Sequence, residues 1–171
     1  MSTARHIRLY GRVNSIAVQK VLWTAAHLQI TKDLERVDAG GKFGLCLLVA
    51  PRNASSPLLT YTIFLILGFP PNYETLNPNK KVPTFVHEKF TLFESHAICK
   101  YMVRKFGTLP EHLALYPQDD LKTMAKIDCW LDWKSATLYP DIQNIFFTMI
   151  RTPPEKRDLK AFEKSKNEAN R

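Results

Sequence analysis

Residues 77–107 read NPNKKVPTFVHEKFTLFESHAICKYMVRKFG, and this segment predicts a β-hairpin followed by a helix. Residues 83–86 (PTFV) and 90–93 (FTLF) are rich in β-branched and aromatic side chains, which is typical of short strands. The residues between them, 87–89, form the expected turn. From residue 94 onward apolar residues recur at helical spacing, and Gly107 is a candidate C-cap.

The chain before this segment predicts a strand, a helix and a second strand. Residues 6–10 (HIRLY) and 34–38 (LERVD) read as strands, and residues 16–30 carry apolar side chains at helical spacing. Asn14 and Ser15 stand where helix N-cap residues belong. The order up to residue 107 is therefore β-α-β followed by β-β-α, and a β-α-β unit normally places its strands in parallel.

The chain after residue 107 predicts helices only. Residues 119–150 show one long helical pattern, bent at Pro140, and the final segment from residue 154 is polar and charged. The expected core face of the long helix carries Leu121, Met124, Ile127, Leu131, Leu138, Ile142, Ile145 and Met149. We expect the seam between the α/β half and the helical half in the loop 108–118.

Composition bounds the class of protein. The chain has 171 residues, 45% of them hydrophobic, which suits one compact domain or two small ones. Its formal net charge is +8, with the basic excess in residues 1–107 and 151–171. Basic surfaces attract anions without distinguishing among them, but no stretch interleaves aromatic and basic residues, so we expect no nucleic-acid partner.

Three cysteines, Cys46, Cys99 and Cys129, are present without a CxxC pair. This pattern disfavours a secreted disulfide framework and a cysteine-based zinc site, and it indicates reduced thiols in the cytoplasm. The first residues lack the apolar core of a signal peptide.

The strings LYGRVNSIAVQKVLW, NPNKKVPTFV and FTLFESHAICKYMVRKFG resemble the glutathione-binding domain of cytosolic glutathione transferases. Residues 115–142 resemble the first helix of that family's C-terminal domain, and the nearest likeness is to its theta-like and bacterial subgroups. The resemblance implies an α/β thioredoxin-like domain in residues 1–107 and a partial, truncated all-α domain in residues 108–171. It also implies a transferase that joins the glutathione thiolate to a hydrophobic electrophile, with glutathione as co-substrate and no metal.

The resemblance assigns glutathione-binding roles to five residues. Val82 precedes the cis-proline Pro83 and pairs its backbone with the cysteinyl part of glutathione. Glu94 meets the γ-glutamyl ammonium, and Ser95 binds the γ-glutamyl carboxylate at a helix N-terminus, which suits an anion. Lys81, or its neighbour Lys80, reaches the glycine carboxylate. Without the resemblance, Ser95 reads as an ordinary N-cap and Glu94 as a solvated acid.

Catalysis of this kind needs a thiolate, and a free thiol with a pKa of about 8.5 is mostly protonated at neutral pH. A hydroxyl hydrogen bond and a helix N-terminus both favour the charged form. By resemblance Ser15 supplies that hydroxyl, and Asn14 is the adjacent candidate. The alternative is that both residues only cap the helix. On the helical side Tyr139, Asn144, Phe147 and Arg151 are candidates to contact the electrophile.

Two departures from the family pattern favour an alternative function. Residues 45–71 form a nearly uncharged insert that matches no part of the pattern, and the helical domain is short. The insert reads as a membrane-leaning hairpin, a partner surface or an incorrect or alternative gene product, and we favour the last because an exposed apolar run promotes aggregation. The alternative function is a catalytically impaired glutathione-binding or interaction module. We expect a homodimer, in which Trp130 and Trp133 are packing or dimer residues, and no membrane partner.

Overall fold

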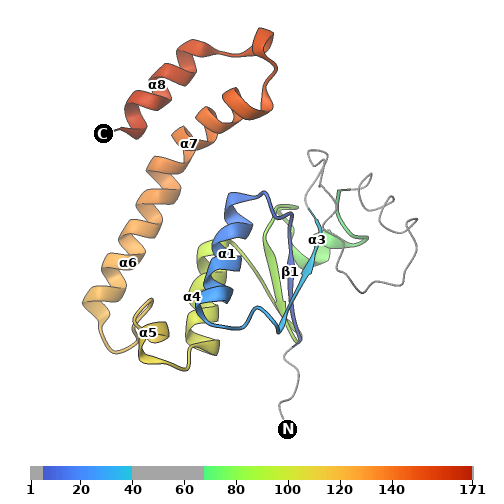
Figure 1. Ribbon diagram of the computed structural model, residues 1–171, viewed down its shortest axis with the longest axis vertical. Helices are drawn as coiled ribbons and strands as arrows, with labels where there is room; N and C mark the ends of the chain where they lie inside the picture. Colours follow the sequence, from blue (N-terminus) through green and yellow to red (C-terminus); the bar gives the residue numbers. More distant parts are fainter. Residues whose placement is uncertain (1–5, 40–67, 171) are drawn as a thin grey trace. The chain divides into compact units, whose positions relative to one another are not determined.

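The computed structural model describes residues 6–39 and 68–170, and the statements below refer to these ranges. The chain divides into two compact units, Met1–Leu115 and Tyr116–Arg171, which Figure 1 shows in the colours of the sequence. The predicted insert at 45–71 lies outside the described residues except for its last four.

The first unit contains a four-stranded sheet in the order β2-β1-β3-β4. The strands are β1 (Ile7–Tyr10), β2 (Leu34–Val37), β3 (Thr84–His87) and β4 (Phe90–Phe93). β2 runs parallel to β1, whereas β3 is antiparallel to both β1 and β4. This mixed sheet, built from a β-α-β unit and a β-β-α unit, confirms the thioredoxin-like arrangement that the resemblance implies.

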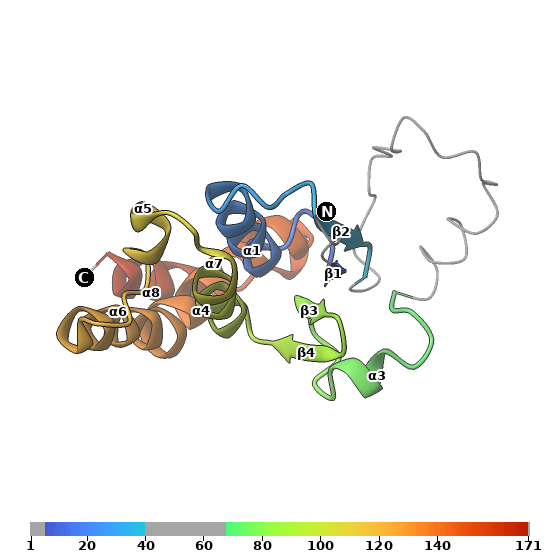
Figure 2. The ribbon, with the colours of Figure 1, turned by 90° about the horizontal axis from the view of Figure 1, so that it is seen from below.

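Two helices cover one face of the sheet. Figures 1 and 2 show α1 (Ile16–His27) and α4 (Ser95–Phe106) on one side of the sheet and the short helix α3 (Tyr73–Leu76) on the other. The core between the sheet and the two long helices is apolar and fully buried, and includes Ile7, Leu9, Val18, Phe85 and Ile98. Burying these side chains is the main stabilising term of the unit.

α1 and α4 also share one polar contact. The Thr24 hydroxyl of α1 donates to Cys99 Sγ of α4 at 3.2 Å. Burial raises the pKa of the Cys99 thiol, which keeps it neutral. Cys99 therefore lacks the thiolate character that a reactive cysteine needs.

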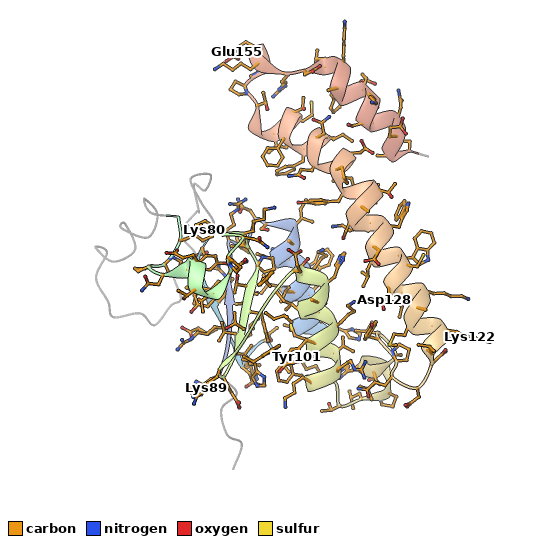
Figure 3. The ribbon with its side chains drawn as sticks, turned by 180° about the vertical axis from the view of Figure 1, so that it is seen from behind. Lys80, Lys89, Tyr101, Lys122, Asp128 and Glu155 are labelled. Atoms are coloured by element: carbon orange, nitrogen blue, oxygen red, sulfur yellow. The ribbon has the colours of Figure 1, made fainter. Side chains whose placement is uncertain are left out.

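The strand register brings three chain segments to one edge of the sheet. Tyr10, the last residue of β1, pairs with Val37 of β2 and with Thr84, the first residue of β3. Thr84 in turn pairs with Phe93, the last residue of β4. α1 and α4 begin a few residues later, at the same edge. Figure 3 shows Lys80 at this end of the sheet and Lys89 at the opposite end.

The helix α5 (Pro110–Leu113) completes the first unit. Its buried His112 lies edge-on to His27 of α1, with ring centroids 5.6 Å apart. Gly107 occupies the C-cap position of α4, as predicted. The boundary between the two units follows α5, between residues 115 and 116.

The second unit is helical throughout. It contains α6 (Leu121–Trp133), the π-helical turn η1 (Lys134–Leu138), α7 (Tyr139–Phe146), a second π-helical turn η2 (Phe147–Arg151), a 3-10 turn η3 (Pro154–Lys156) and α8 (Leu159–Ala169). The turn η1 ends two residues before Pro140, which lacks the N–H that the carbonyl of Ala136 would accept in a regular helix. Pro140 therefore disturbs the long helix where the sequence predicts it.

The expected core face of the long helix is only partly buried. Leu121 is 71% exposed and Met149 is 41% exposed, whereas the other six predicted residues are half-buried. Within this unit α8 packs along α7. A helical stripe of apolar residues predicts that a face can be covered, but not what covers it.

Candidate functional site

The loop from β1 to α1 is held tightly to its neighbours. A Cβ atom at Gly11 would overlap the Val18 side chain of α1 and would lie 3.4 Å from Val82 Cβ, so only glycine fits between them. The Gly11 N–H donates to the carbonyl of Val37, and the Arg36 guanidinium, which also pairs with Asp38, donates to the Gly11 carbonyl. The start of α1 is therefore fixed against both β2 and the loop before β3.

Ser15 is the N-cap residue of α1 and is half-buried. Within the described part of the chain its hydroxyl makes no capping hydrogen bond to α1. The interpretation of Ser15 as a cap alone therefore lacks the side-chain hydrogen bond that such a cap normally makes. Asn14 precedes it and is exposed.

The loop before β3 contains the predicted proline turn. The Val82–Pro83 peptide bond is cis. Pro83 is buried, Val82 is half-buried, and Lys80 and Lys81 are exposed. Both lysine side chains therefore remain available to an anion at this edge of the sheet.

The start of α4 carries an unusual backbone conformation. Glu94, the N-cap residue, has φ 71° and ψ 113°, a conformation that a residue with a side chain rarely adopts. Such outliers persist where the surrounding structure enforces them and are frequent at functional sites. Ser95 is the first residue of α4 and is buried, whereas the Glu94 side chain is exposed.

The first unit thus gathers the predicted glutathione-site residues at one edge of its sheet. Ser15 heads α1, Ser95 heads α4, and the Val82–Pro83 turn enters β3 beside the ends of β1 and β4. Two helix N-termini supply unpaired N–H groups and positive potential there. This arrangement can bind an anionic ligand with an extended backbone and can stabilise a negative charge beside Ser15.

The candidates for contacting an electrophile lie in the second unit. The side-chain amide of Asn144 is engaged within this unit: it donates to the Ala161 carbonyl at 3.2 Å and to the Ser165 hydroxyl at 2.9 Å. These bonds join α7 to α8. Tyr139 has the Lys134 ammonium 4.1 Å from its ring centroid, and Phe147 is 48% exposed. The Arg151 side chain lies outside the described residues.

A shallow hollow on α7 and the start of η2 is lined by Pro140, Gln143, Asn144 and Phe147. Elsewhere, the residues described in the two ranges contain no group of three or more His, Cys, Asp and Glu placed to hold a metal ion. In those same ranges, no helix has both the length and the apolar character needed to cross a bilayer.

Sequence reasoning missed several residues that hold this edge together. Gly11 and Arg36 fix the loop to α1, and Tyr73, Asn77 and Thr84 fix the proline turn. The Asn-Pro dipeptide at 77–78 was the one available signal, because such dipeptides mark turns. The partners of Asn77 are set by three-dimensional contacts, so the sequence pattern does not identify them.

The first unit is thioredoxin-like and a helical unit follows it, which is the two-domain arrangement that the sequence resemblance implies. Comparison with known proteins agrees. Residues 68–104 match the family model described as Glutathione S-transferase, N-terminal domain. The glutathione S-transferase GstB of Escherichia coli K12 is 30% identical over 96% of this chain, and the match covers 66% of that relative.

Solved structures show the same likeness. A theta class glutathione S-transferase of Xanthomonas axonopodis pv. citri, solved with glutathione bound, is 28% identical with a TM-score of 0.72, over 96% of this chain and 65% of that one. The glutathione transferase F2 of Populus trichocarpa is 20% identical with a TM-score of 0.69, and the match covers 95% of this chain and 65% of that protein. This likeness supports the fold alone. The chain belongs to the cytosolic glutathione transferase family. It spans slightly less than two thirds of the length of these relatives.

Proposed function

We propose that this protein is a glutathione transferase that joins the thiolate of glutathione to a hydrophobic electrophile. The single observation that carries the proposal is the position of Ser15. It heads α1 with its hydroxyl free of capping, at the sheet edge that also presents Val82 and Ser95. A hydroxyl that can donate to sulfur and a helix N-terminus both favour the thiolate of bound glutathione over its thiol.

In this proposal each part of the tripeptide has a partner. The γ-glutamyl carboxylate takes the N–H and hydroxyl of Ser95, and Glu94 takes the ammonium. The Val82 backbone pairs with the cysteinyl residue beside Pro83, as an added strand would. Lys81 or Lys80, both exposed, reaches the glycine carboxylate.

Ser15, or Asn14 in its place, then donates a hydrogen bond to the sulfur. The thiolate attacks the electrophilic carbon, and the leaving group departs with the bonding electron pair. The proposal includes no metal, because thiolate chemistry of this kind needs none.

The two domains of the proposal are a glutathione-binding domain in residues 1–107 and a partial helical domain in residues 108–171. A cytoplasmic location and a homodimer complete it. Trp130 and Trp133 of α6 are 66% and 43% exposed, which suits a surface that a second copy covers.

The second candidate is a module that binds glutathione without turnover. One observation favours it. The side-chain amide of Asn144, a candidate for contacting the electrophile, donates hydrogen bonds to α8. Retention on immobilised glutathione without product formation would select this candidate.

The experiment is a conjugation assay with a generic aryl halide that compares the parent with Ser15→Ala. Loss of the hydroxyl should raise the thiol pKa of bound glutathione and lower the rate at neutral pH by about 10- to 100-fold. Thr31→Ala removes an exposed hydroxyl away from the site and serves as the matched control. Equal rates for the parent and Ser15→Ala would contradict the assignment and make Asn14 the next candidate.

A further inference from the structure

A buried polar cluster of three side chains, Tyr73, Asn77 and Thr84, lies behind the proline turn. Tyr73 is 1% exposed, Asn77 2% and Thr84 0%. Buried polar groups are costly unless their hydrogen bonds are made, so a fully buried trio calls for a specific reason.

The hydrogen bonds of the cluster form one directed chain. The Tyr73 hydroxyl donates to the Lys81 carbonyl at 2.8 Å, and its oxygen lies 2.6 Å from Thr84 Oγ1. Because tyrosine has a single hydroxyl proton, Thr84 must be the donor in that second bond. Asn77 Nδ2 donates to Thr84 Oγ1 at 3.1 Å and to the Lys81 carbonyl at 2.9 Å.

Each side-chain proton of the network has an acceptor. Both N–H bonds of the Asn77 amide are used, and its oxygen accepts the N–H of Asn79 at 3.0 Å. A fully satisfied buried network of this kind is rigid and specifies one conformation. Burial also raises the pKa of the Tyr73 hydroxyl, which keeps its proton in place.

The network forms hydrogen bonds to the chain on both sides of the Val82–Pro83 turn. Its two fixed points are the carbonyl of Lys81 and the side chain of Thr84, and only Val82 and Pro83 lie between them. The ring of Tyr73 is itself held between Tyr10 of β1, at 5.9 Å, and Phe69, at 4.6 Å. The position of the Val82 backbone is therefore set from α3.

We propose that Tyr73, Asn77 and Thr84 are positioning residues that hold the Val82 backbone for pairing with the cysteinyl part of the ligand. The inference rests on the proposed function, because it concerns the same glutathione site. None of the three residues touches the ligand in this account. Their role is to hold the turn in its binding conformation before the ligand arrives. Binding then costs less conformational entropy, and the affinity is higher.

The test measures the Kd for glutathione and the unfolding midpoint of four variants: two that remove a hydroxyl of the network and two controls. Tyr73→Phe keeps the ring and removes the hydroxyl. Thr84→Val removes the hydroxyl of β3, whereas Thr84→Ser keeps it and should rescue binding. Thr75→Val is the control on the same helix, because its exposed hydroxyl donates to the Asn72 carbonyl, outside the cluster.

We expect Tyr73→Phe and Thr84→Val to raise the Kd for glutathione by about tenfold. The Kd is measured at a temperature well below the unfolding transition of each variant. The KM for glutathione should rise while the KM for the electrophile stays unchanged. Thr84→Ser and Thr75→Val should bind like the parent. A purely structural role would lower the unfolding midpoint and leave the Kd of the folded chain unaltered, and that result would overturn the inference.

Amide hydrogen exchange in the turn separates this inference from the proposed function, since it needs no ligand. The Asn79 amide, which donates to Asn77 Oδ1 at 3.0 Å, should exchange faster in Tyr73→Phe than in the parent, because the network that holds Asn77 has lost a hydrogen bond. Faster exchange in a chain that binds no glutathione would contradict the proposed function and leave the positioning intact. Unchanged exchange would overturn the positioning even if the parent binds.

Discussion

Tyr73 holds its proton more firmly in the folded chain than in the unfolded one. Burial, the largest cause, raises the pKa of its hydroxyl above the ordinary value of 10.0, and the hydrogen bond with Thr84 offsets this in part. Below that pH both states carry the proton, so the stabilising effect of Tyr73 is fully present. At higher pH the unfolded chain loses the proton first, and the free energy of unfolding falls as pH rises.

We therefore predict that the parent loses stability from about pH 10 upward. Tyr73→Phe should lose less over the same range, because it has no hydroxyl to ionise. A smaller decline should remain, since burial also raises the pKa of Cys99 and of Tyr101. Urea unfolding at about pH 9 and about pH 11 measures both slopes. Identical declines in the parent and the variant would show that Tyr73 does not titrate in this way.

At the scale of elements, the contact between α7 and α8 depends on Asn144. Its amide donates to the Ala161 carbonyl and the Ser165 hydroxyl, and Ser165 is buried. α8 is otherwise mostly polar, and its Leu159 is 61% exposed. A short helix with little apolar burial relies on such specific contacts.

Asn144→Ala should lower the free energy of unfolding of the helical unit by about 1–2 kcal/mol, because it leaves buried partners without their donor. Gln143→Ala, at an exposed neighbouring position of α7, should change it little. Helix content followed by circular dichroism during urea unfolding provides the measurement. Equal destabilisation by the two substitutions would contradict the role of Asn144.

Local pattern predicted the elements of the first unit well. The strands, the hairpin and the long helices of that unit lie within a few residues of their predicted bounds, because alternation and helical spacing act over neighbouring residues. The extent of burial of the apolar face of α6 was not predictable, since burial depends on what packs against a helix. The hydrogen bonds of Asn144 were not predictable for the same reason, because its partners come from α8.

The candidate site shows the same division. Ser15, Ser95 and Pro83 each stand at a helix head or a strand start, which sequence pattern marks, whereas their predicted roles in the site came from the resemblance. Tyr73 and Thr84 were not found, since a hydrogen bond between α3 and β3 leaves no periodic signal. Their part in the site follows only from the distances.

At the scale of the whole molecule, the proposed homodimer makes a prediction about mass. Trp130 and Trp133 form an exposed edge-to-face pair on α6, with ring centroids 5.4 Å apart. Aromatic side chains are enriched in interface cores. Sedimentation should show the parent at twice the chain mass and Trp130→Ser shifted toward the monomer.

Trp23→Ser is the matched control for the dimer, because Trp23 is 72% exposed but lies on α1. It should leave the dimer intact. A monomeric parent, or an equal shift with both substitutions, would contradict the assignment of the dimer surface to α6.

The most direct test of the whole account is calorimetric titration of glutathione at about pH 7 in two buffers of different ionisation enthalpy, which reports the proton released on binding. The account predicts saturable uptake with release of close to one proton per glutathione, because the thiol is protonated in solution and ionised beside Ser15. S-methylglutathione, which has no thiol proton, should bind without that release. Absence of uptake, or uptake with no proton released, would contradict the central claim.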